Sequence, residues 1–214
     1  YKSTRAEDPP ELPGQVPLLL EVLDAAGLPV AEAAGYEADD VIGTLATDAG
    51  MPVDIVTGDR DLFQLVDDAA GVRVLYVGKG VARHERVDEE WVLGKYGIRA
   101  DQYAAFATLR GDASDGLPGV KGVGDKTAAS LLQKYDDLPG ILAAVDDPGS
   151  DLGPGPRSKI RAAADYLAVA PKVVAVVRDL DLPRERLDLP SAPVEPDLLA
   201  DLVERWSLSS PVER

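Results

Sequence analysis

Residues 111–127 read Gly-Asp-Ala-Ser-Asp-Gly-Leu-Pro-Gly-Val-Lys-Gly-Val-Gly-Asp-Lys-Thr. Two carboxylates, Asp112 and Asp115, precede a glycine hairpin at residues 119–127 that opens a helix. Carboxylate oxygens suit a divalent metal ion. Glycines let the backbone approach a ligand closely, and the free N–H groups at a helix start attract anions. A metal site beside a phosphate-binding turn suggests phosphodiester chemistry on a nucleic acid.

Two further acidic clusters lie upstream, at boundaries between predicted elements. The first consists of Glu37, Asp39 and Asp40, and the second of Asp59 and Asp61. Sites in open α/β sheets lie at the carboxyl ends of strands, and the second cluster directly follows the predicted strand 53–57. With Asp112 and Asp115 there are seven carboxylates, enough for two Mg²⁺ or Mn²⁺ ions held partly through water. Any of the first five acids could instead be a helix cap.

Hydrophobic spacing predicts an α/β sheet domain followed by a helical domain. Strands are expected at 28–34, 53–57, 72–77 and 81–87, the last two paired as a hairpin around 78–80. Their alternation with helices favours βαβ units and a parallel sheet. Residues 1–15 are polar and broken by proline, and we expect them to be mobile.

Helices account for most of the remaining pattern. They are predicted at 16–26, from 39 to about 49, just after Gly58, and at 89–96, 101–110, 126–135, 138–145, 157–167, 171–177 and 196–206. The aromatic residues Trp91, Tyr96, Tyr103 and Phe106 have helical spacing and are expected in the core. His84, the single histidine, is expected at the surface. Arg157, Lys159 and Arg161 begin a helix and could either reach phosphates or form a solvated face.

Composition describes an ordinary water-soluble chain. Of its 214 residues 45% are hydrophobic, and no apolar run approaches the ~20 residues that a membrane span needs. There is no cysteine, which excludes disulfides and thiolate metal sites. We therefore expect a cytoplasmic protein without a membrane partner.

The net charge of −16 at first argues against a nucleic-acid partner. Its distribution is uneven, however. Residues 111–178 carry 8 basic and 9 acidic residues, whereas residues 1–110 carry 10 and 20 and residues 179–214 carry 4 and 9. The nearly neutral middle is where we expect the phosphate-facing surface. Bound divalent ions would offset part of the acidic clusters.

Three segments together resemble a known family. Residues 35–40 (Gly-Tyr-Glu-Ala-Asp-Asp), 57–62 (Thr-Gly-Asp-Arg-Asp-Leu) and 111–127 are similar to the bacterial and phage 5′-nucleases. These comprise the flap endonucleases and the 5′–3′ exonuclease domain of DNA polymerase I. The resemblance implies a two-metal phosphodiesterase with a PIN-like parallel-sheet core and a helical arch. It also implies a C-terminal helix-three-turn-helix, a form of helix-hairpin-helix, that holds duplex DNA.

The resemblance assigns three domains and a role to each motif residue. Residues 1–110 correspond to the nuclease core, 111–190 to the helix-hairpin-helix domain, and 191–214 to a C-terminal helix packing on the core. The metal ligands are Glu37, Asp39, Asp40, Asp59, Asp61, Asp112 and Asp115. The catalytic cations are Lys2 and Arg5, which would contact the scissile phosphate. The DNA contacts are Tyr1, Gly119, Lys121, Gly122, Gly124, Lys126 and Thr127, and the backbone carbonyls that would bind K⁺ are those of Val120 and Val123.

Two departures from the family accompany these matches. Relatives begin with a strand that ends in an aspartate ligand, and another aspartate shortly precedes the Tyr-Lys element. Neither has a counterpart here because the sequence begins at Tyr1, so we expect an N-terminal segment to precede it. Relatives often have Asn where this chain has Gly116. The chain end shows no polymerase motif, which favours a free-standing nuclease.

The function expected from the sequence is that of a structure-specific 5′-nuclease, a flap endonuclease or 5′–3′ exonuclease acting in replication and repair. Its partner would be DNA with a 5′ single-stranded flap or a 5′ end on duplex, bound by a monomer associated with the nucleoid. The alternative is a catalytically deficient, metal-dependent scaffold that binds flap or duplex DNA. A PIN-type ribonuclease is disfavoured by the hairpin, and a Ca²⁺-binding protein by the lack of a twelve-residue EF-hand loop.

Overall fold

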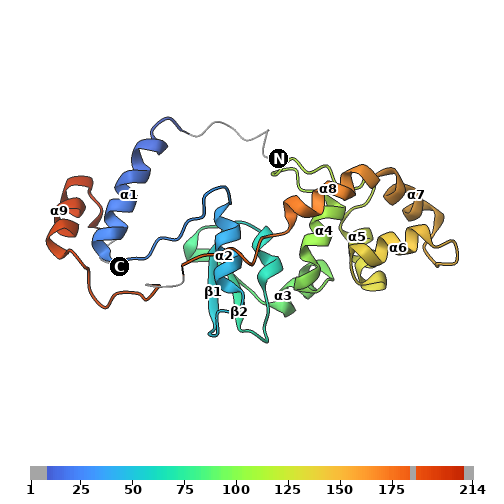
Figure 1. Cartoon of the computed structure of the whole chain (residues 1–214), viewed down its shortest axis with the longest axis horizontal. Helices are drawn as coiled ribbons and strands as arrows, with labels where there is room; N and C mark the ends of the chain where they lie inside the picture. Colours follow the sequence, from blue (N-terminus) through green and yellow to red (C-terminus); the bar gives the residue numbers. More distant parts are fainter. Residues whose placement is uncertain (1–8, 184–186, 210–214) are drawn as a thin grey trace. The chain divides into compact units, whose positions relative to one another are not determined.

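The computed structural model describes residues 9–183 and 187–209. The chain separates into two compact units. Residues 35–180 form the first unit, and residues 9–34 together with the described residues after 180 form the second. Figure 1 shows that the first unit holds the sheet and most of the helices. Each unit has its own cluster of buried residues.

The described sheet consists of β1 (Val53–Thr57), β2 (Val72–Tyr76) and β3 (Glu85–Val87), in that order. β1 runs parallel to β2 with Val53 opposite Val72, and β2 runs antiparallel to β3 with Val74 opposite Val87. Side chains of β2 alternate between buried and partly exposed, as expected for a strand with one face against the core. The predicted parallel crossover and the predicted hairpin are both confirmed. A short 3₁₀ turn, η2 (Val81–Arg83), occupies the start of the strand predicted at 81–87.

Aromatic side chains fill the centre of the first unit. Phe63 lies in η1 (Asp61–Leu65), a 3₁₀ helix that follows β1, and is fully buried. Its ring centroid is 5.3 Å from that of Tyr76, 5.4 Å from that of Trp91 and 5.4 Å from that of Tyr103, all close to edge-to-face. The partner rings come from β2, from α3 (Glu89–Tyr96) and from α4 (Tyr103–Arg110), and the short 3₁₀ helix η3 (Ala100–Gln102) lies between the two helices. The predicted aromatic core is confirmed, and His84 is exposed as expected.

Four helices follow the loop that contains residues 111–124. They are α5 (Asp125–Tyr135), α6 (Leu138–Asp146), α7 (Pro154–Ala162) and α8 (Ala164–Val174). The helix predicted at 157–167 is wrong as one element, because the backbone leaves helical geometry at Ala163. The separate helix predicted at 171–177 is also wrong. Pro171 lies inside α8, and the chain becomes extended after Val174.

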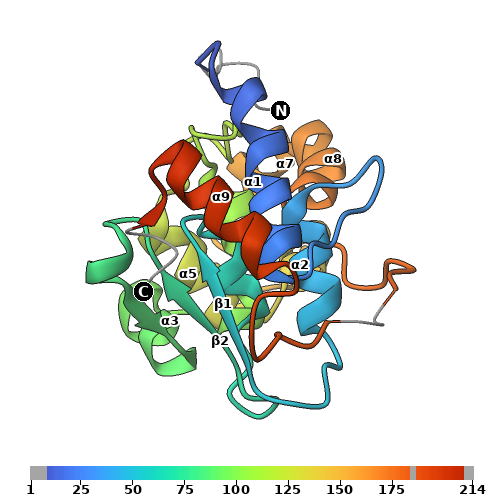
Figure 2. The same ribbon diagram turned by 90° about the vertical axis from the view of Figure 1, so that its left-hand side faces the viewer.

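The second unit is a pair of helices, α1 (Leu12–Ala26) and α9 (Pro196–Trp206), which lie side by side in Figures 1 and 2. Its buried residues are Ala25, Leu199 and Leu202. The helix start predicted at Val16 is wrong, because α1 already begins at Leu12 with a proline in its first turn, where the missing N–H costs nothing. The strand predicted at 28–34 is absent from this described stretch. The helical arch, and the packing of the C-terminal helix on the core, stay predictions.

No described helix combines the length and the apolar character that crossing a membrane requires.

Candidate metal centre and phosphate-binding hairpin

The first acidic cluster opens α2 (Ala38–Ala46), the helix that packs on β1 and η1. Glu37 is its N-cap, and the backbone N–H of Glu37 donates to Asp40 Oδ2 at 3.1 Å. The other oxygen of the same carboxylate, Asp40 Oδ1, accepts from the N–H of Val177 at 2.9 Å. The cap role considered in the sequence is therefore real for Asp40, and this carboxylate also binds a segment 137 residues away in the chain.

The second cluster lies directly beyond the carboxyl end of β1, where sites of open α/β sheets are found. The N–H of Asp59 donates to Thr57 Oγ1 at 2.9 Å, and the N–H of Asp61 donates to Asp59 Oδ1 at 3.0 Å. The Asp59 side chain thus closes a turn that leads into η1, whose first residue is Asp61. Asp61 lines the same cavity as Glu37, Asp39 and Asp40.

The third cluster sits in a loop whose shape depends on glycine. Asp112 and Leu117 exchange two backbone hydrogen bonds of 3.0 and 2.8 Å, which closes the loop around a buried Asp115. Gly111 and Gly119 have φ of 85° and 67° and lie against each other's backbone. A Cβ on Gly119 would lie 2.4 Å from a backbone oxygen, so a side chain has no room there.

Asp112 is a partly buried carboxylate that is held by its own hydrogen-bond donors. Burial by itself would raise the pKa of the Asp112 carboxyl. The hydroxyl and amide of Ser114 both donate to Asp112, and the guanidinium of Arg110 lies 3.3 Å from it. These donors and the charge of Arg60 outweigh burial and lower its pKa.

Asp61 shows the opposite behaviour and links the three clusters. Burial is the largest cause that raises the pKa of Asp61, to about 7, and neighbouring negative charges add to it. Those charges belong, in decreasing order of effect, to Asp59, Asp115, Asp112 and Asp39. Aspartates from all three clusters thus lie close enough to Asp61 for their charges to disfavour its ionised form.

A cavity of about 190 Å³ opens in that region. Its lining comprises Glu37, Asp39, Asp40, Asp61 and residues 172–177, with Lys172 as the basic member. Within residues 9–183 and 187–209, no three Asp, Glu or His side chains lie close enough to hold a metal ion as they stand. The donor chemistry nevertheless fits Mg²⁺ or Mn²⁺, because only oxygen ligands are offered and a cation would relieve the mutual repulsion that raises the Asp61 pKa.

The hairpin at residues 119–127 leads directly from the third cluster into α5. Val120 and Val123 are buried, and the N–H of Val123 donates to the carbonyl of Val120 at 2.9 Å. One predicted K⁺ ligand is thus already an acceptor inside the turn, and its second lone pair is the one that a cation would use. The predicted phosphate contacts lie on the exposed side of this turn. Exposed are Lys121, Gly122, Gly124 and Lys126, while Gly119 and Thr127 are partly exposed.

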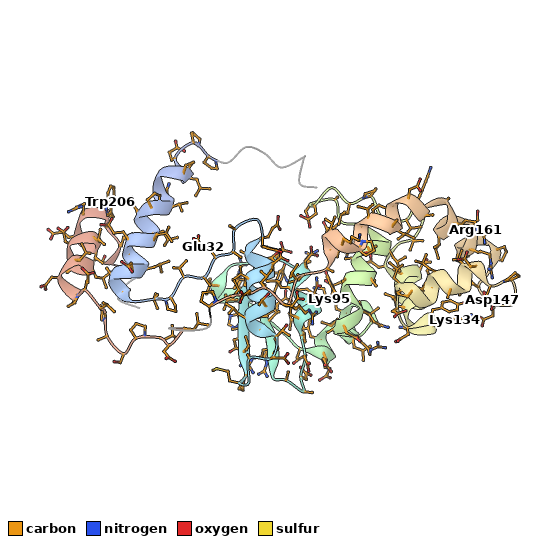
Figure 3. All side chains as sticks on the ribbon, viewed as in Figure 1. Glu32, Lys95, Lys134, Asp147, Arg161 and Trp206 are labelled. Carbon is orange, nitrogen blue, oxygen red and sulfur yellow. The ribbon has the colours of Figure 1, made fainter. Side chains whose placement is uncertain are left out.

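The basic residues of α7 divide into different roles. Arg157 is a structural residue, because its guanidinium donates to the carbonyls of Val145 and Asp147 at 2.6 and 2.9 Å. Lys159 Nζ donates to the carbonyl of Gly122 at 2.7 Å and so supports the hairpin. Arg161 also donates to the carbonyl of Val145, at 3.0 Å, and lies at the end of this unit away from the sheet (Figure 3).

Three sequence predictions lie outside the described residues, namely those on Tyr1, Lys2 and Arg5. Conversely, Gln64, which is 5% exposed, and the backbone of residues 174–177 belong to this region without having been predicted. A signal for Gln64 was present, because it is the single polar residue in the buried run 62–66. Nothing in the local sequence indicated that residues 174–177 would return to the acidic clusters.

Comparison with known proteins identifies the two halves of this architecture. Residues 1–97 match a family described as "5'-3' exonuclease, N-terminal resolvase-like domain", and residues 98–197 match "5'-3' exonuclease, C-terminal SAM fold". A Streptomyces coelicolor protein named 5'-3' exonuclease is 54% identical over 97% of this chain and 69% of its own length. A Mycobacterium tuberculosis protein of the same name is 45% identical over 97% of this chain and 68% of its length. DNA polymerase I of Mycobacterium bovis is 46% identical over 75% of this chain and 18% of its length.

Solved structures agree on the fold. The T5 D15 protein co-crystallised with metal ions superposes with a TM-score of 0.62 at 19% identity, covering 96% of this chain and 75% of that one. Human GEN1 in complex with Holliday junction DNA superposes with a TM-score of 0.59 at 19% identity, covering 94% and 52%. The predicted fold class, an α/β core followed by a helical domain of this type, is confirmed.

Proposed function

This chain belongs to the 5′-3′ exonuclease family, and from that membership we propose that it is a structure-specific 5′-nuclease that hydrolyses DNA phosphodiesters. The preferred substrate would be a duplex with a 5′ single-stranded flap or a 5′ end. The activity would depend on two or more divalent ions, Mg²⁺ or Mn²⁺. The protein would act as a cytoplasmic monomer on chromosomal DNA.

One observation carries this proposal above the others. Carboxylates of two acidic clusters line one cavity, namely Glu37, Asp39 and Asp40 at the start of α2 and Asp61 in η1. Burial, followed by the charges of aspartates from all three clusters, raises the pKa of Asp61 there. Such an arrangement is electrostatically unfavourable without a cation and is typical of a metal-dependent hydrolase.

The residues of the chain divide the work. Bound divalent ions would supply Lewis-acid chemistry, acidifying an attacking water and balancing charge on the phosphate. Glu37, Asp39, Asp61 and Asp115 would hold them, with Asp112 kept ionised by its own donors. Asp40, Asp59 and Asp112 have oxygens that already accept backbone N–H groups, and the Glu37 side chain does the same in its capping box, so we propose that part of the set ligates through water.

The hairpin would grip the duplex by its phosphates and without reading sequence. Lys121, Lys126 and the N–H groups before α5 face solvent at one turn, and the start of a helix favours an anion. K⁺ on the carbonyls of Val120 and Val123 would extend this contact. The loop that contains Asp112 leads directly into the hairpin, so one short segment joins the proposed phosphate contacts to the acidic residues.

The alternative function is a metal-dependent scaffold that binds flap or duplex DNA without cutting it. The double occupation of the Asp40 carboxylate by backbone N–H groups favours it, because that acid already has a structural role. Both functions predict DNA binding, and they differ only in cleavage.

Cleavage of a 5′-labelled flap duplex tests the proposal, with Mg²⁺, Mn²⁺, Ca²⁺ or EDTA and Asp112→Asn as the control variant. We expect short 5′ products with Mg²⁺ or Mn²⁺, and none in EDTA or with the variant. Tight binding of the flap duplex in Ca²⁺ without cleavage under any condition would overturn the nuclease and leave the scaffold. Equal cleavage by Asp112→Asn would overturn the assignment of the acidic site.

A further inference from the structure

Gln64 is a buried amide whose bonding capacity is satisfied by backbone groups of two segments. Its Nε2 donates to the carbonyl of Asp61 at 2.8 Å and to the carbonyl of Val174 at 2.9 Å. Its Oε1 accepts from the N–H of Val176 at 3.0 Å. A buried amide with all these bonds holds its partners in a fixed geometry, because breaking any one of them leaves a buried polar group unpaired.

The partners belong to the acidic site on one side and to the end of α8 on the other. Asp61 opens η1, which carries Gln64 itself. Residues 174–178, here named the return segment, leave α8 in extended conformation and come back to the sheet domain. Gln64 falls within the N-terminal family match and the return segment within the C-terminal match, so this amide joins the two.

Further contacts hold the return segment against both acidic elements. The N–H of Val177 donates to Asp40 Oδ1, and Arg178 Nη2 donates to the carbonyl of Gln64 at 2.6 Å. Gly43 of α2 leaves no room for a side chain, because a Cβ there would lie 2.3 Å from Val176 Cγ1 and 2.7 Å from the carbonyl oxygen of Val177. The segment is therefore pressed onto α2 while Gln64 binds it to η1.

We propose that Gln64 is a positioning residue for the metal site, which sets the distance between the carboxylates of η1 and α2 through the return segment. The inference rests on the proposed function and adds a residue that touches neither metal nor DNA. Removing the amide breaks the bonds that tie η1 to the backbone of Val174 and Val176 and leaves only the bond from Arg178 to the Gln64 carbonyl among those described above. The Asp61 and Asp40 carboxylates are then no longer held at a fixed distance from each other. Mutation of a group that orients metal ligands typically lowers metal affinity by about 10- to 100-fold.

Gln102 provides a matched control within the same chain. It is 4% exposed, against 5% for Gln64. Its Nε2 donates to the carbonyls of Leu132 and Asp136 at 3.2 and 2.6 Å, and its Oε1 accepts from the N–H of Arg99 at 3.0 Å. It thus makes the same three kinds of bond, but to α3–α5 connections instead of the acidic clusters. Any general effect of losing a buried glutamine is reproduced by Gln102→Met.

The test compares Gln64→Met with Gln102→Met in the full chain. Thermal unfolding during a Mg²⁺ titration gives the concentration for half-maximal stabilisation, and hydrogen exchange reports on the peptide spanning residues 174–178. We expect both variants to unfold more easily than the wild type. Only Gln64→Met should raise the Mg²⁺ midpoint by about tenfold or more and speed exchange in the return segment. In the flap assay it should lower kcat at fixed Mg²⁺ with KM for DNA unchanged.

Equal Mg²⁺ midpoints for the two variants would overturn the positioning role while leaving the nuclease proposal intact. A wild type that neither gains stability with Mg²⁺ nor cleaves would instead overturn the proposed function and the positioning role with it. If Gln64→Met fails to fold, hydrogen exchange is measured in the wild type instead. Rapid exchange of the Val176 amide would contradict its hydrogen bond to Gln64. Gln64→Asn, whose shorter amide cannot span both segments, then replaces it in the titration.

Discussion

Replacing Asp61 by asparagine should make the metal-free protein more stable, although it removes a proposed ligand. Burial, followed by neighbouring negative charges, raises the pKa of the Asp61 carboxyl from 3.8 to about 7 in the folded chain. The folded state therefore binds a proton more tightly than the unfolded state, and the free energy of unfolding falls as pH rises from 3.8 through about 7. Asparagine keeps the shape and the backbone bonds of η1 but has no charge to bury.

The size of the effect follows from the two pKa values. Their difference corresponds to an upper bound of about 4 kcal/mol well above pH 7. Because part of the side chain reaches solvent, roughly 2 kcal/mol is the better expectation. In a chain of this size that corresponds to a rise in Tm of about 4–8 °C for Asp61→Asn. Around pH 4 the gain should be small, since the wild-type carboxyl is then protonated in the folded state and only about half ionised in the unfolded state.

Urea or thermal unfolding in EDTA at pH 4, 6 and 8 measures the difference between variant and wild type. Saturating Mg²⁺ at pH 8 should reverse the order, because cation binding stabilises the wild type by mass action and the variant much less. Two results would refute the reasoning. One is a variant less stable than the wild type in EDTA at pH 8, and the other is a stability difference that does not grow between pH 4 and pH 8.

Three shorter predictions follow from other parts of the first unit. Gly119→Ala places a Cβ 2.4 Å from the carbonyl oxygen of Arg110 at φ 67°, so it should lower the free energy of unfolding by about 2–4 kcal/mol in urea titrations; a neutral result would mean that the loop adjusts freely. Phe63→Ala should cost about 3–5 kcal/mol in the same measurement, because it empties the centre of the aromatic core, and a loss below about 1 kcal/mol would contradict that packing. Lys126→Ala should weaken duplex binding and reduce the slope of log Kd against log salt by about one, with an unchanged Tm; an unaltered slope would remove this lysine from the phosphate contacts.

Local sequence patterns predicted helices and strands correctly where a single hydrophobic periodicity dominated the segment. The strand at 53–57 and the helix at 89–96 were placed correctly, since a buried strand and a capped helix each have a pattern of their own. Predictions failed where a local signal was outweighed by distant packing. Pro171 was expected to begin a helix, yet α8 continues through it, because the buried residues Leu167, Ala170 and Val174 hold both sides of the proline on the core.

Local patterns along the chain predict the residues of the site, namely seven carboxylates in three motifs and a glycine hairpin, and through them the family and its fold. The chemistry of a side chain and the need for glycine at a positive φ are properties of short segments, so they can be inferred from neighbouring residues. How these carboxylates affect one another's pKa depends on the tertiary structure. The raised pKa of Asp61 depends on burial and on charges from three segments, and the ties of Gln64 and Asp40 reach 112 and 137 residues along the chain. Such contacts are set by packing, and no local pattern encodes them.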